Sequence, residues 1–490
     1  MISLVLHEGA SYRPDDLIRL LGEADPSLDG SSARALAEET QRLLINLPLS
    51  SLVPDSRFTS EDSAADIDMG ESDDHLGSLA RPHARHGGIQ IRHLVGSGVL
   101  QTTSADIQLE ILPKVTQMDD TAASRAGLLR MWSYAADLNL RDNSVTALMQ
   151  AARLPLHEWL MQRFLEQVDR LLARGIRAHY VEEEGNLATV RGRLAVGENL
   201  RQNAFAPQRF YCRYETFSPN RPENRLIRCA IAKIQARTQV PATRKKASAL
   251  TEWLHEIPPS LDIVRDFSLW RVDRLMTHYQ EIRPTCEWIL RERAPTPISG
   301  REALFGRFVR MNDVFERYVT RWMQERMSED HAVAGPGAGH DATRVLCASR
   351  LGLVGHQMRP DIRVHQIQGR SRHCTAVLDA KWKKARDDGK IASREDFYQM
   401  YAYASHWLRK PAGEATTSPE SLIGLVYPSV NPRDASVPFA FSELGHCVRG
   451  AALKFLLPQF EKGSGHQEWK EGFLLHGLDA YPAWLDQLAA

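Results

Sequence analysis

The most constraining feature of the sequence is the segment TAVLDAKWKK, residues 375–384, in which an apolar run ends in Asp379, Ala380 and Lys381. The run is short and rich in strand-forming residues, which predicts a buried β-strand. Because side chains alternate between the two faces of a strand, Asp379 and Lys381 lie on the same face. Lysine is scarce in this chain, yet four of its 12 lysines fall between 381 and 390. The segment therefore predicts a strand that ends in a paired carboxylate and ammonium group.

A second carboxylate precedes this strand. Pro360 and Asp361 stand eighteen residues before Asp379, within another extended run. If the two strands are neighbours, both carboxylates can bind one hard divalent cation such as Mg²⁺, which prefers oxygen ligands. Lys381 would then hold or deprotonate the attacking water and stabilise the negative charge of the transition state. The chemistry that this arrangement favours is hydrolysis of a phosphodiester.

The helix expected around DFYQMYAYASHWL adds two polar side chains to this group. Gln399 and Tyr403 are four residues apart, so they share a helix face and can reach the same site. An acidic residue two before a lysine is expected by chance about once or twice in a chain of this composition. The preceding Pro-Asp, the apolar lead-in and the helix make the combination specific. The alternative for Gln399 and Tyr403 is an ordinary amphipathic helix with a buried tyrosine.

The C-terminal part of the chain, residues 301–490, predicts a compact α/β domain. Its pattern gives a long helix marked by apolar residues from Leu304 to Met323, then a glycine-rich loop at 335–342, two extended runs, a helix and the strand SLIGLVYPS. Helices and strands that alternate in this way predict a mixed sheet flanked by helices. The glycine-rich loop lacks the lysine of a phosphate-binding loop, so we interpret it as a connector.

The preceding residues predict an α+β N-terminal region in three segments. Residues 1–54 contain a strand-like stretch and a helix, and residues 55–90 are acidic and polar, which predicts a flexible linker. In 91–300, alternation up to residue 115 predicts a β-meander or hairpin, and apolar residues at helical spacing follow. The stretch 221–310 is rich in arginine, either as a solvated helical face or as a surface that contacts phosphates.

Composition excludes several classes of protein. The formal net charge is zero, so any nucleic-acid surface must be a local patch. No stretch approaches the roughly 18 uninterrupted apolar residues of a spanning helix, and the first residues lack the features of a signal peptide, so we expect a cytoplasmic protein. The six cysteines are far apart and lack the spacing of a metal site. No G-x-x-x-x-G-K-[ST] motif occurs, so a step driven by nucleotide hydrolysis would need a partner.

Taken together, the order Pro-Asp, Asp-Ala-Lys-Trp-Lys, YQMYAY and LIGLVYP resembles the core of PD-(D/E)xK nucleases. In particular it resembles the McrC family, the endonuclease subunits of 5-methylcytosine restriction systems. Upstream, LEILPKV (109–115), TVRGRL (189–194) and CRYETFSPNRPENRLI (212–227) are similar to the N-terminal part of that family. The resemblance implies a C-terminal restriction-endonuclease-like domain, within an α/β fold class, preceded by an α+β region.

The same resemblance implies a function and its partners. It implies a Mg²⁺-dependent DNA endonuclease of an antiviral restriction system, which acts on double-stranded and modified DNA. The nuclease would work with an AAA+ GTPase partner similar to McrB, and residues 91–300 would bind that partner. An alternative from another class is a non-catalytic adaptor that keeps the nuclease-like fold and regulates a partner NTPase. The presence of Asp361, Asp379 and Lys381 favours the nuclease, because an adaptor has no need of all three residues.

Individual residues match positions of the family. Asp361, Asp379 and Lys381 match its catalytic positions, and the two aspartates are implied to bind the metal. Glu316, in the stretch NDVFERY, matches the acidic position that many such nucleases place beside the metal; the alternative is a solvated helix carboxylate. Gln399 and Tyr403 match a Q-x-x-x-Y element found in some branches.

Overall fold

A computed structural model describes most of the chain and divides it into two compact units. The described residues are 2–46, 78–83, 87–114, 121–135, 154–271, 277–290, 304–336, 344–345, 357–369, 371–383, 392–408, 421–441, 448–460, 469–478 and 481–490. The first unit comprises Met1–Leu156 and Arg293–Ala490, and the second comprises His157–Glu292. No helix among the described residues has both the length and the apolar character that a membrane crossing requires. Most of the predicted linker, 55–90, lies outside the described residues.

The first unit contains a four-stranded sheet with the strand order β1-β6-β5-β10. Its strands are β1 (Ile2–His7), β6 (Asp106–Leu112), β5 (Leu94–Gln101) and β10 (Leu304–Arg310). Strand β1 is parallel to β6, and the other neighbours are antiparallel. The hairpin predicted between residues 91 and 115 is present as β5 and β6. A smaller sheet beside it consists of β2 (Ser11–Tyr12), β4 (Gly88–Ile91) and β3 (Ala80–His83).

The helix predicted from Leu304 onward is wrong in its first part. Residues 304–310 form β10, in which Phe308 pairs with Gly96 of β5. Helix α11 (Met311–Arg326) begins directly after this strand. The run LFGRFVR fits a helical period and a strand period about equally well, and pairing with a distant strand decides between them. The remainder of the predicted helix is present.

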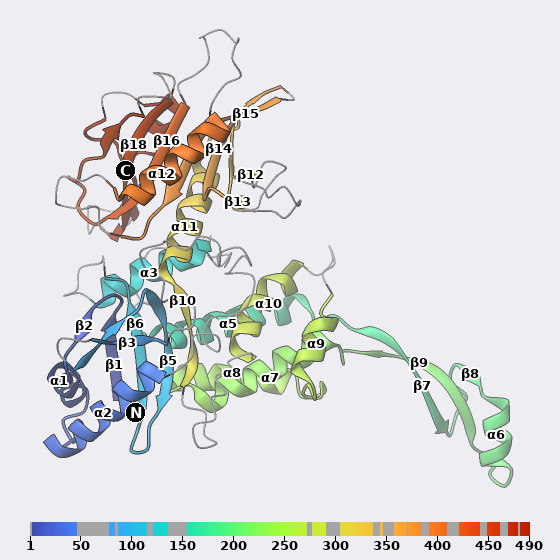
Figure 1. Ribbon diagram of the computed structural model, residues 1–490. Coiled ribbons are helices and arrows are strands. Elements are labelled where there is room, and N and C mark those ends of the chain that lie inside the picture. The colour runs from blue at the N-terminus through green and yellow to red at the C-terminus, as the bar shows by residue number, and fades with distance from the viewer. Residues whose placement is uncertain are drawn as a thin grey trace, which may run out of the picture. The chain divides into compact units, whose positions relative to one another are not determined.

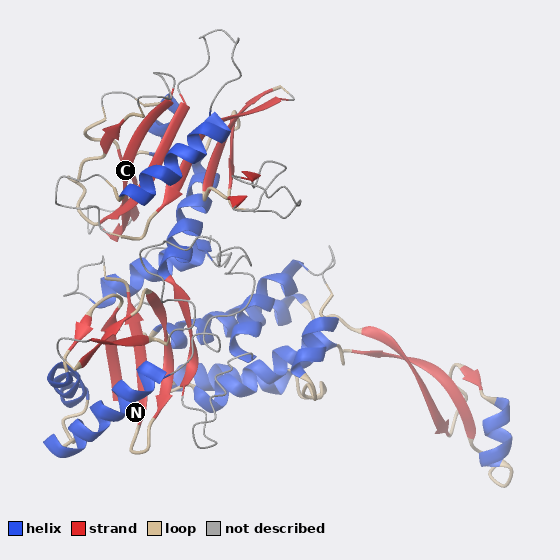
Figure 2. Cartoon of the chain, viewed as in Figure 1, coloured by secondary structure: helices blue, strands red, loops and turns tan. Residues whose placement is uncertain are grey.

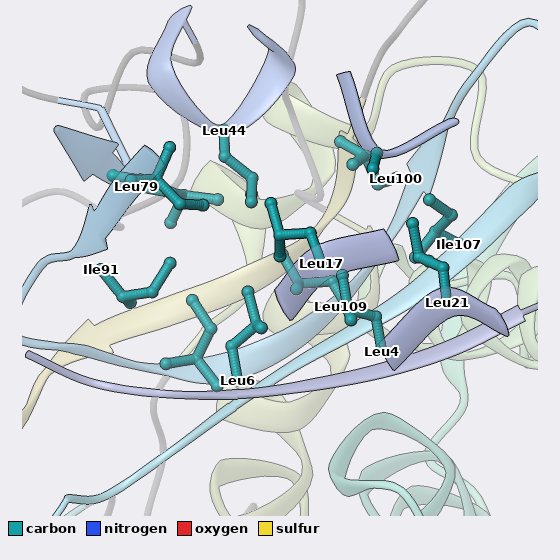
Figure 3. Packing of buried hydrophobic residues seen from close by; sticks show 14 of the residues in the cluster. Leu4, Leu6, Leu17, Leu21, Leu44, Leu79, Ile91, Leu100, Ile107 and Leu109 are labelled. Atoms are coloured by element: carbon teal, nitrogen blue, oxygen red, sulfur yellow. The ribbon is translucent and has the colours of Figure 1, made fainter. Parts of the chain in front are cut away.

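Two helices cover the four-stranded sheet and complete its core. They are α1 (Pro14–Ala24) and α2 (Gly30–Asn46). Pro14 opens α1 with a backbone angle suited to a helix, and two acidic residues in the first turn favour its N-terminus. Figure 3 shows Leu17 and Leu21, one turn apart on α1, among the leucines of β1 and β6. These side chains are fully buried, so the sheet rests on an apolar core of its own.

The second sheet of this unit is mixed and has seven strands, with the order β11-β14-β15-β16-β18-β17 and β19 paired to β18. The strands are β11 (His331–Ala334), β14 (Ile362–Gln368), β15 (Ser371–Ala380), β16 (Ser421–Ser429), β17 (Val437–Phe439), β18 (Val448–Phe460) and β19 (Trp469–Leu474). The pairs β15–β16 and β16–β18 are parallel, and the others are antiparallel. Two short strands, β12 (Arg344–Val345) and β13 (Gln357–Met358), pair separately. The predicted mixed sheet is therefore present.

Helices pack on both faces of the mixed sheet, as Figures 1 and 2 show. Helix α12 (Arg394–Tyr403) and the π-helix η4 (Ala404–Leu408) that continues it pack against Ile423, Leu425 and Ala452. Phe455, three residues beyond Ala452 on β18, points to the opposite face, where Trp322 of α11 meets it edge-on. Helix α3 (Thr121–Ala135) lies next to α11, and η5 (Ala483–Leu488) ends the unit.

A buried carboxylate ties three elements together on the α11 side of this sheet. Glu471 of β19 is almost fully buried. Its carboxylate accepts hydrogen bonds from side chains of α3 and α11, and bonds to an ionised acceptor are among the stronger ones in proteins. The four donors are Arg130, at 2.9 Å, Tyr318, at 2.7 Å, Trp322, at 2.9 Å, and Arg326, at 3.3 Å. Because all four donate to one acceptor group, the loss of this carboxylate would leave several buried polar groups without a partner.

The second unit is a group of helices from which a long hairpin extends. The helices are α5 (Leu156–Arg174), α7 (Pro222–Arg237), α8 (Pro241–Trp253), α9 (Ile263–Leu269) and α10 (Thr277–Leu290). The apolar residues at helical spacing that the sequence shows within 91–300 are accounted for here by α5 and by α7, which begins at Pro222.

The hairpin, here called the arm, consists of residues 179–218 and leads away from the helices of its unit (Figure 1). It comprises β7 (His179–Leu187), β8 (Arg193–Leu194), α6 (Val196–Asn203) and β9 (Phe210–Ser218). Strand β7 pairs with β9 along its whole length. Six large apolar side chains of the arm are exposed: Tyr180, Val190, Val196, Leu200, Phe205 and Phe217.

Candidate active site

The two predicted aspartates meet at the ends of neighbouring antiparallel strands. In the register of β14 and β15, Ile362 is opposite Leu378, so Asp361 and Asp379 each lie one residue further toward the same edge. The backbone N–H of Ala380 donates to Oδ2 of Asp361 at 2.7 Å. Asp379 is only 1% exposed. The strands that carry Asp361 and Asp379 are therefore neighbours, which is the condition for the two carboxylates to share one site.

The carboxyl group of Asp361 lies in a negative environment. Loss of hydration raises its pKa well above the ordinary value, and the negative charges of Asp379 and Glu316 raise it further. Glu316 is on α11, which packs on the other side of the sheet from α12. Thus the structure brings Glu316 within electrostatic reach of Asp361. The carboxyl groups of Asp361 and Asp379 are therefore neighbours, and Glu316 lies near enough for its charge to act on Asp361.

Lys381 is held between the aspartates and α12. Its ammonium group lies 2.7 Å from Oδ2 of Asp379 and donates to Oε1 of Gln399 at 3.0 Å. Burial alone would lower the pKa of Lys381, but Asp379 and then Asp361 raise it above the ordinary value. The lysine is therefore a cation in this structure. It neutralises part of the acidic cluster.

Gln399 and Tyr403 form a relay of hydrogen bonds behind the lysine. Nε2 of Gln399 donates to the Tyr403 hydroxyl at 3.0 Å, and that hydroxyl donates to the carbonyl oxygen of Arg359 at 3.1 Å. Tyr403 is 2% exposed and packs in the core under α12. The relay thus fixes the Gln399 amide so that its oxygen faces Lys381, and it links this lysine to the backbone just before Pro360.

Two further residues near this cluster were missed by the sequence reasoning. Lys383 pairs with Asp396 at 2.7 Å, which attaches the segment after β15 to the first turn of α12. Tyr427 of β16 is 1% exposed, and its hydroxyl has no hydrogen-bond partner in the described structure. Burial raises the pKa of Tyr427 above its ordinary value, and Asp396 adds to the effect. The cluster of lysines between 381 and 390 could have drawn attention to Lys383. Tyr427 lies in the apolar strand SLIGLVYPS, where nothing in the sequence marks it as a site residue.

The donor set suits a hard divalent cation. In the described part of the chain, no three His, Cys, Asp or Glu side chains form a ready-made metal cluster. Mg²⁺, however, is usually held by one or two carboxylates and keeps several waters. Asp361 and Asp379 supply such a pair, with Glu316 as a third acid nearby. A cation here would also offset the mutual repulsion that raises the pKa of Asp361. The residues present therefore fit Mg²⁺.

Comparison with family models identifies the family of this chain. A family model described as McrBC 5-methylcytosine restriction system component matches residues 89–428, well over half of the chain. A solved structure with a similar fold is a refined half-complex from a tetradecameric assembly of Thermococcus gammatolerans McrB AAA+ hexamers with bound McrC. Its similar chain is 19% identical, with 92% of this chain and 94% of that chain covered and a TM-score of 0.62.

A second similar structure is the cryo-EM structure of the Thermococcus gammatolerans McrBC complex. It is 20% identical, covers 66% of this chain and 87% of that chain, and has a TM-score of 0.45. The search of curated proteins found no match. At these identities, the first solved structure shows a shared fold over nearly the whole chain.

Proposed function

The chain belongs to the family of McrBC 5-methylcytosine restriction system components, and from this premise we propose that it is the Mg²⁺-dependent DNA endonuclease subunit of such a system. The observation that supports the proposal most is the cluster of Asp361, Asp379 and Lys381 at one strand edge of a mixed sheet. This is the arrangement expected of a PD-(D/E)xK nuclease. Its substrate would be double-stranded DNA that carries a modification, and its role would be defence in the cytoplasm against invading DNA.

The residues of the cluster would divide the work of phosphodiester hydrolysis. Asp361 and Asp379, with Glu316 beside them, would hold Mg²⁺, which when bound lowers the pKa of water and offsets charge on the phosphate. Lys381 would orient the attacking water and stabilise the negative charge that develops on the phosphate oxygens. Gln399 and Tyr403 would act through the lysine, because their hydrogen bonds fix the position of its ammonium group.

We propose an AAA+ GTPase as the partner of this chain. The solved relative of similar fold is bound to McrB AAA+ hexamers, and the present sequence contains no nucleotide-binding motif of its own. The arm supports the proposal, because its three-stranded sheet and single helix leave six large apolar side chains exposed. Such a surface is suited to a protein partner.

The experiment that tests the nuclease assignment compares one active-site variant with a surface control. Asp379→Asn removes one negative charge and keeps the shape, whereas Asp15→Asn changes an exposed carboxylate on α1. Both chains would be mixed with the AAA+ partner, GTP, Mg²⁺ and DNA that carries 5-methylcytosine. We expect the control to cleave and Asp379→Asn to lose cleavage by at least about 10³-fold while it still stimulates the partner. Full cleavage by Asp379→Asn would favour an adaptor with a nuclease-like fold.

A further inference from the structure

We propose that Glu8 is a positioning residue of the active site, which fixes the segment that carries Lys381 by accepting a hydrogen bond from the indole of Trp382. This inference rests on the proposed nuclease function and extends it to the N-terminal sheet. Glu8 follows β1 at the very beginning of the chain, whereas Trp382 directly follows Lys381. The two side chains are joined through Nε1 of Trp382, which donates to Oε1 of Glu8.

The carboxyl group of Glu8 is buried in an apolar environment. Its exposed fraction is 0%, and the fully buried leucines of β1 precede it. Oε1 also accepts from the backbone N–H of Lys114 at 3.4 Å. Oε2 accepts no hydrogen bond in the described structure and faces Nδ1 of His93 at 3.9 Å. A buried carboxyl group with an unsatisfied oxygen costs free energy relative to an apolar side chain of similar size. Its contribution is therefore orientation of a partner group and not stability.

Trp382 is placed where it can transmit that orientation to the catalytic lysine. It is 3% exposed, and its ring packs against Phe315 of α11, with 5.3 Å between ring centroids. Phe315 directly precedes Glu316. Lys381 points the other way, to Asp379 and to Gln399 of α12. The two adjacent side chains are thus anchored on opposite sides of the same backbone.

The backbone between these two anchors has few other constraints. The N–H of Lys381 donates to the carbonyl oxygen of Val426 at 2.8 Å, and this is the last ladder bond to β16 in the described structure, because β15 ends at Ala380. After that bond, the N–H of Lys383 turns back to the carbonyl of Lys381 at 2.9 Å. A rotation of the Trp382 backbone would therefore move Lys381 relative to Asp379. Displacements of about 1 Å near a reacting group can reduce rates by about 10²-fold.

The surroundings of Glu8 make its protonation state sensitive to pH near neutrality. Burial raises the pKa of Glu8 to about 7, although the Trp382 hydrogen bond and the Lys114 charge act against this rise. The other titratable groups around it are His93, from the loop before β5, and His7, its neighbour on β1, whose pKa is lowered by burial. An ionised and a neutral Glu8 both offer an acceptor to Trp382, but the ionised form binds the indole more strongly.

The test uses both sides of the hydrogen bond in the full chain. Trp382→Phe keeps an aromatic ring against Phe315 and removes the donor, whereas Glu8→Leu removes the acceptor and Glu8→Gln keeps one. Single-turnover cleavage would be measured with the AAA+ partner, GTP, Mg²⁺ and methylated DNA. We expect Glu8→Leu and Trp382→Phe each to slow the chemical step by about 10-fold, with the DNA concentration for half-maximal rate unchanged. The double variant should be no slower than either single one, and Glu8→Gln should stay within about 3-fold of the wild type.

Two measurements report on the bond without cleavage. The wild type should show one indole N–H resonance that is absent in Trp382→Phe and shifted in Glu8→Leu, and amide exchange at Lys381 should be about 10-fold faster in Glu8→Leu. If the wild type does not cleave DNA, the proposed function fails, whereas these two readouts still test the contact. An unshifted resonance with unchanged exchange, or single-variant effects that multiply in the double variant, would overturn the positioning role.

Discussion

Glu8→Gln should stabilise the protein at alkaline pH although it removes a charge and a charge-assisted hydrogen bond. The pKa of Glu8 is raised from its ordinary 4.5 to about 7, with burial as the largest cause. A carboxyl group with a raised pKa favours folding when it is protonated. Its favourable contribution is complete below the unfolded pKa and is lost as the pH rises through the folded pKa. The amide that replaces it has no proton to lose, so the variant should not share this dependence.

The size of the effect follows from the shift. One pKa unit corresponds to about 1.36 kcal/mol, so ionisation of buried Glu8 costs the wild type about 3 kcal/mol at pH 8 and less than about 1 kcal/mol at pH 5. For a cooperative unit of this size, about 3 kcal/mol corresponds to a change in melting temperature of roughly 4 °C. The gain in melting temperature from Glu8→Gln should therefore grow between pH 5 and pH 8.

Thermal unfolding of the wild type and the variant at pH 5, 6, 7 and 8 measures this difference, and other titrating groups cancel in the comparison. Glu23→Gln is a matched control, since Glu23 is an exposed carboxylate whose ion pair with Arg19 is at the surface. Its difference from the wild type should stay small and flat with pH. A Glu8→Gln difference that is equally flat would show that Glu8 is ionised at no cost in the folded protein, which would refute the reasoning.

Three further outcomes are expected. Lys381→Ala should lower single-turnover cleavage by about 10²-fold or more with DNA binding retained, because the ammonium group stabilises charge in the transition state; a near-normal rate would show a merely structural lysine. Glu471→Gln should lower stability by about 2 kcal/mol, since the partly exposed guanidinium groups of Arg130 and Arg326 lose their anion and the buried donors Tyr318 and Trp322 lose a charged acceptor, and an unchanged melting temperature would contradict the network. Tyr180→Ser combined with Phe205→Ser should reduce stimulation of the partner's GTPase without a change in melting temperature, and full stimulation would exclude the arm as the contact.

The features that could be predicted from the sequence are those that depend on neighbours along the chain. The alternation in TAVLDAKWKK gave the face shared by Asp379 and Lys381, and the four-residue spacing gave the shared face of Gln399 and Tyr403. Contacts across long stretches of chain could not be predicted in this way. Nothing in the local pattern around Glu8 indicates a bond to Trp382, because that bond depends on how two sheets pack.

The wrong prediction of a helix at residues 304–310 also results from a contact between distant parts of the chain. Residues 304–310 carry a pattern that a helix and a strand satisfy equally, and the choice was made by an open edge of β5, far earlier in the chain. Local periodicity has no access to that edge. Whether a short apolar segment forms a helix or a strand therefore depends on its pairing in the tertiary structure.

The direct passage from β10 into α11 limits how this chain can be divided or inherited. A gene fragment that starts near residue 301 would encode a strand without its sheet and would leave β5 with an unpaired edge in the remaining fragment. Unpaired edges promote aggregation. A recombination event at this point would damage both products, so we expect the seven-stranded sheet to be a poor cassette for transplantation. New partners or specificities are more readily acquired by exchange of the arm, whose two ends, His179 and Ser218, are paired neighbours.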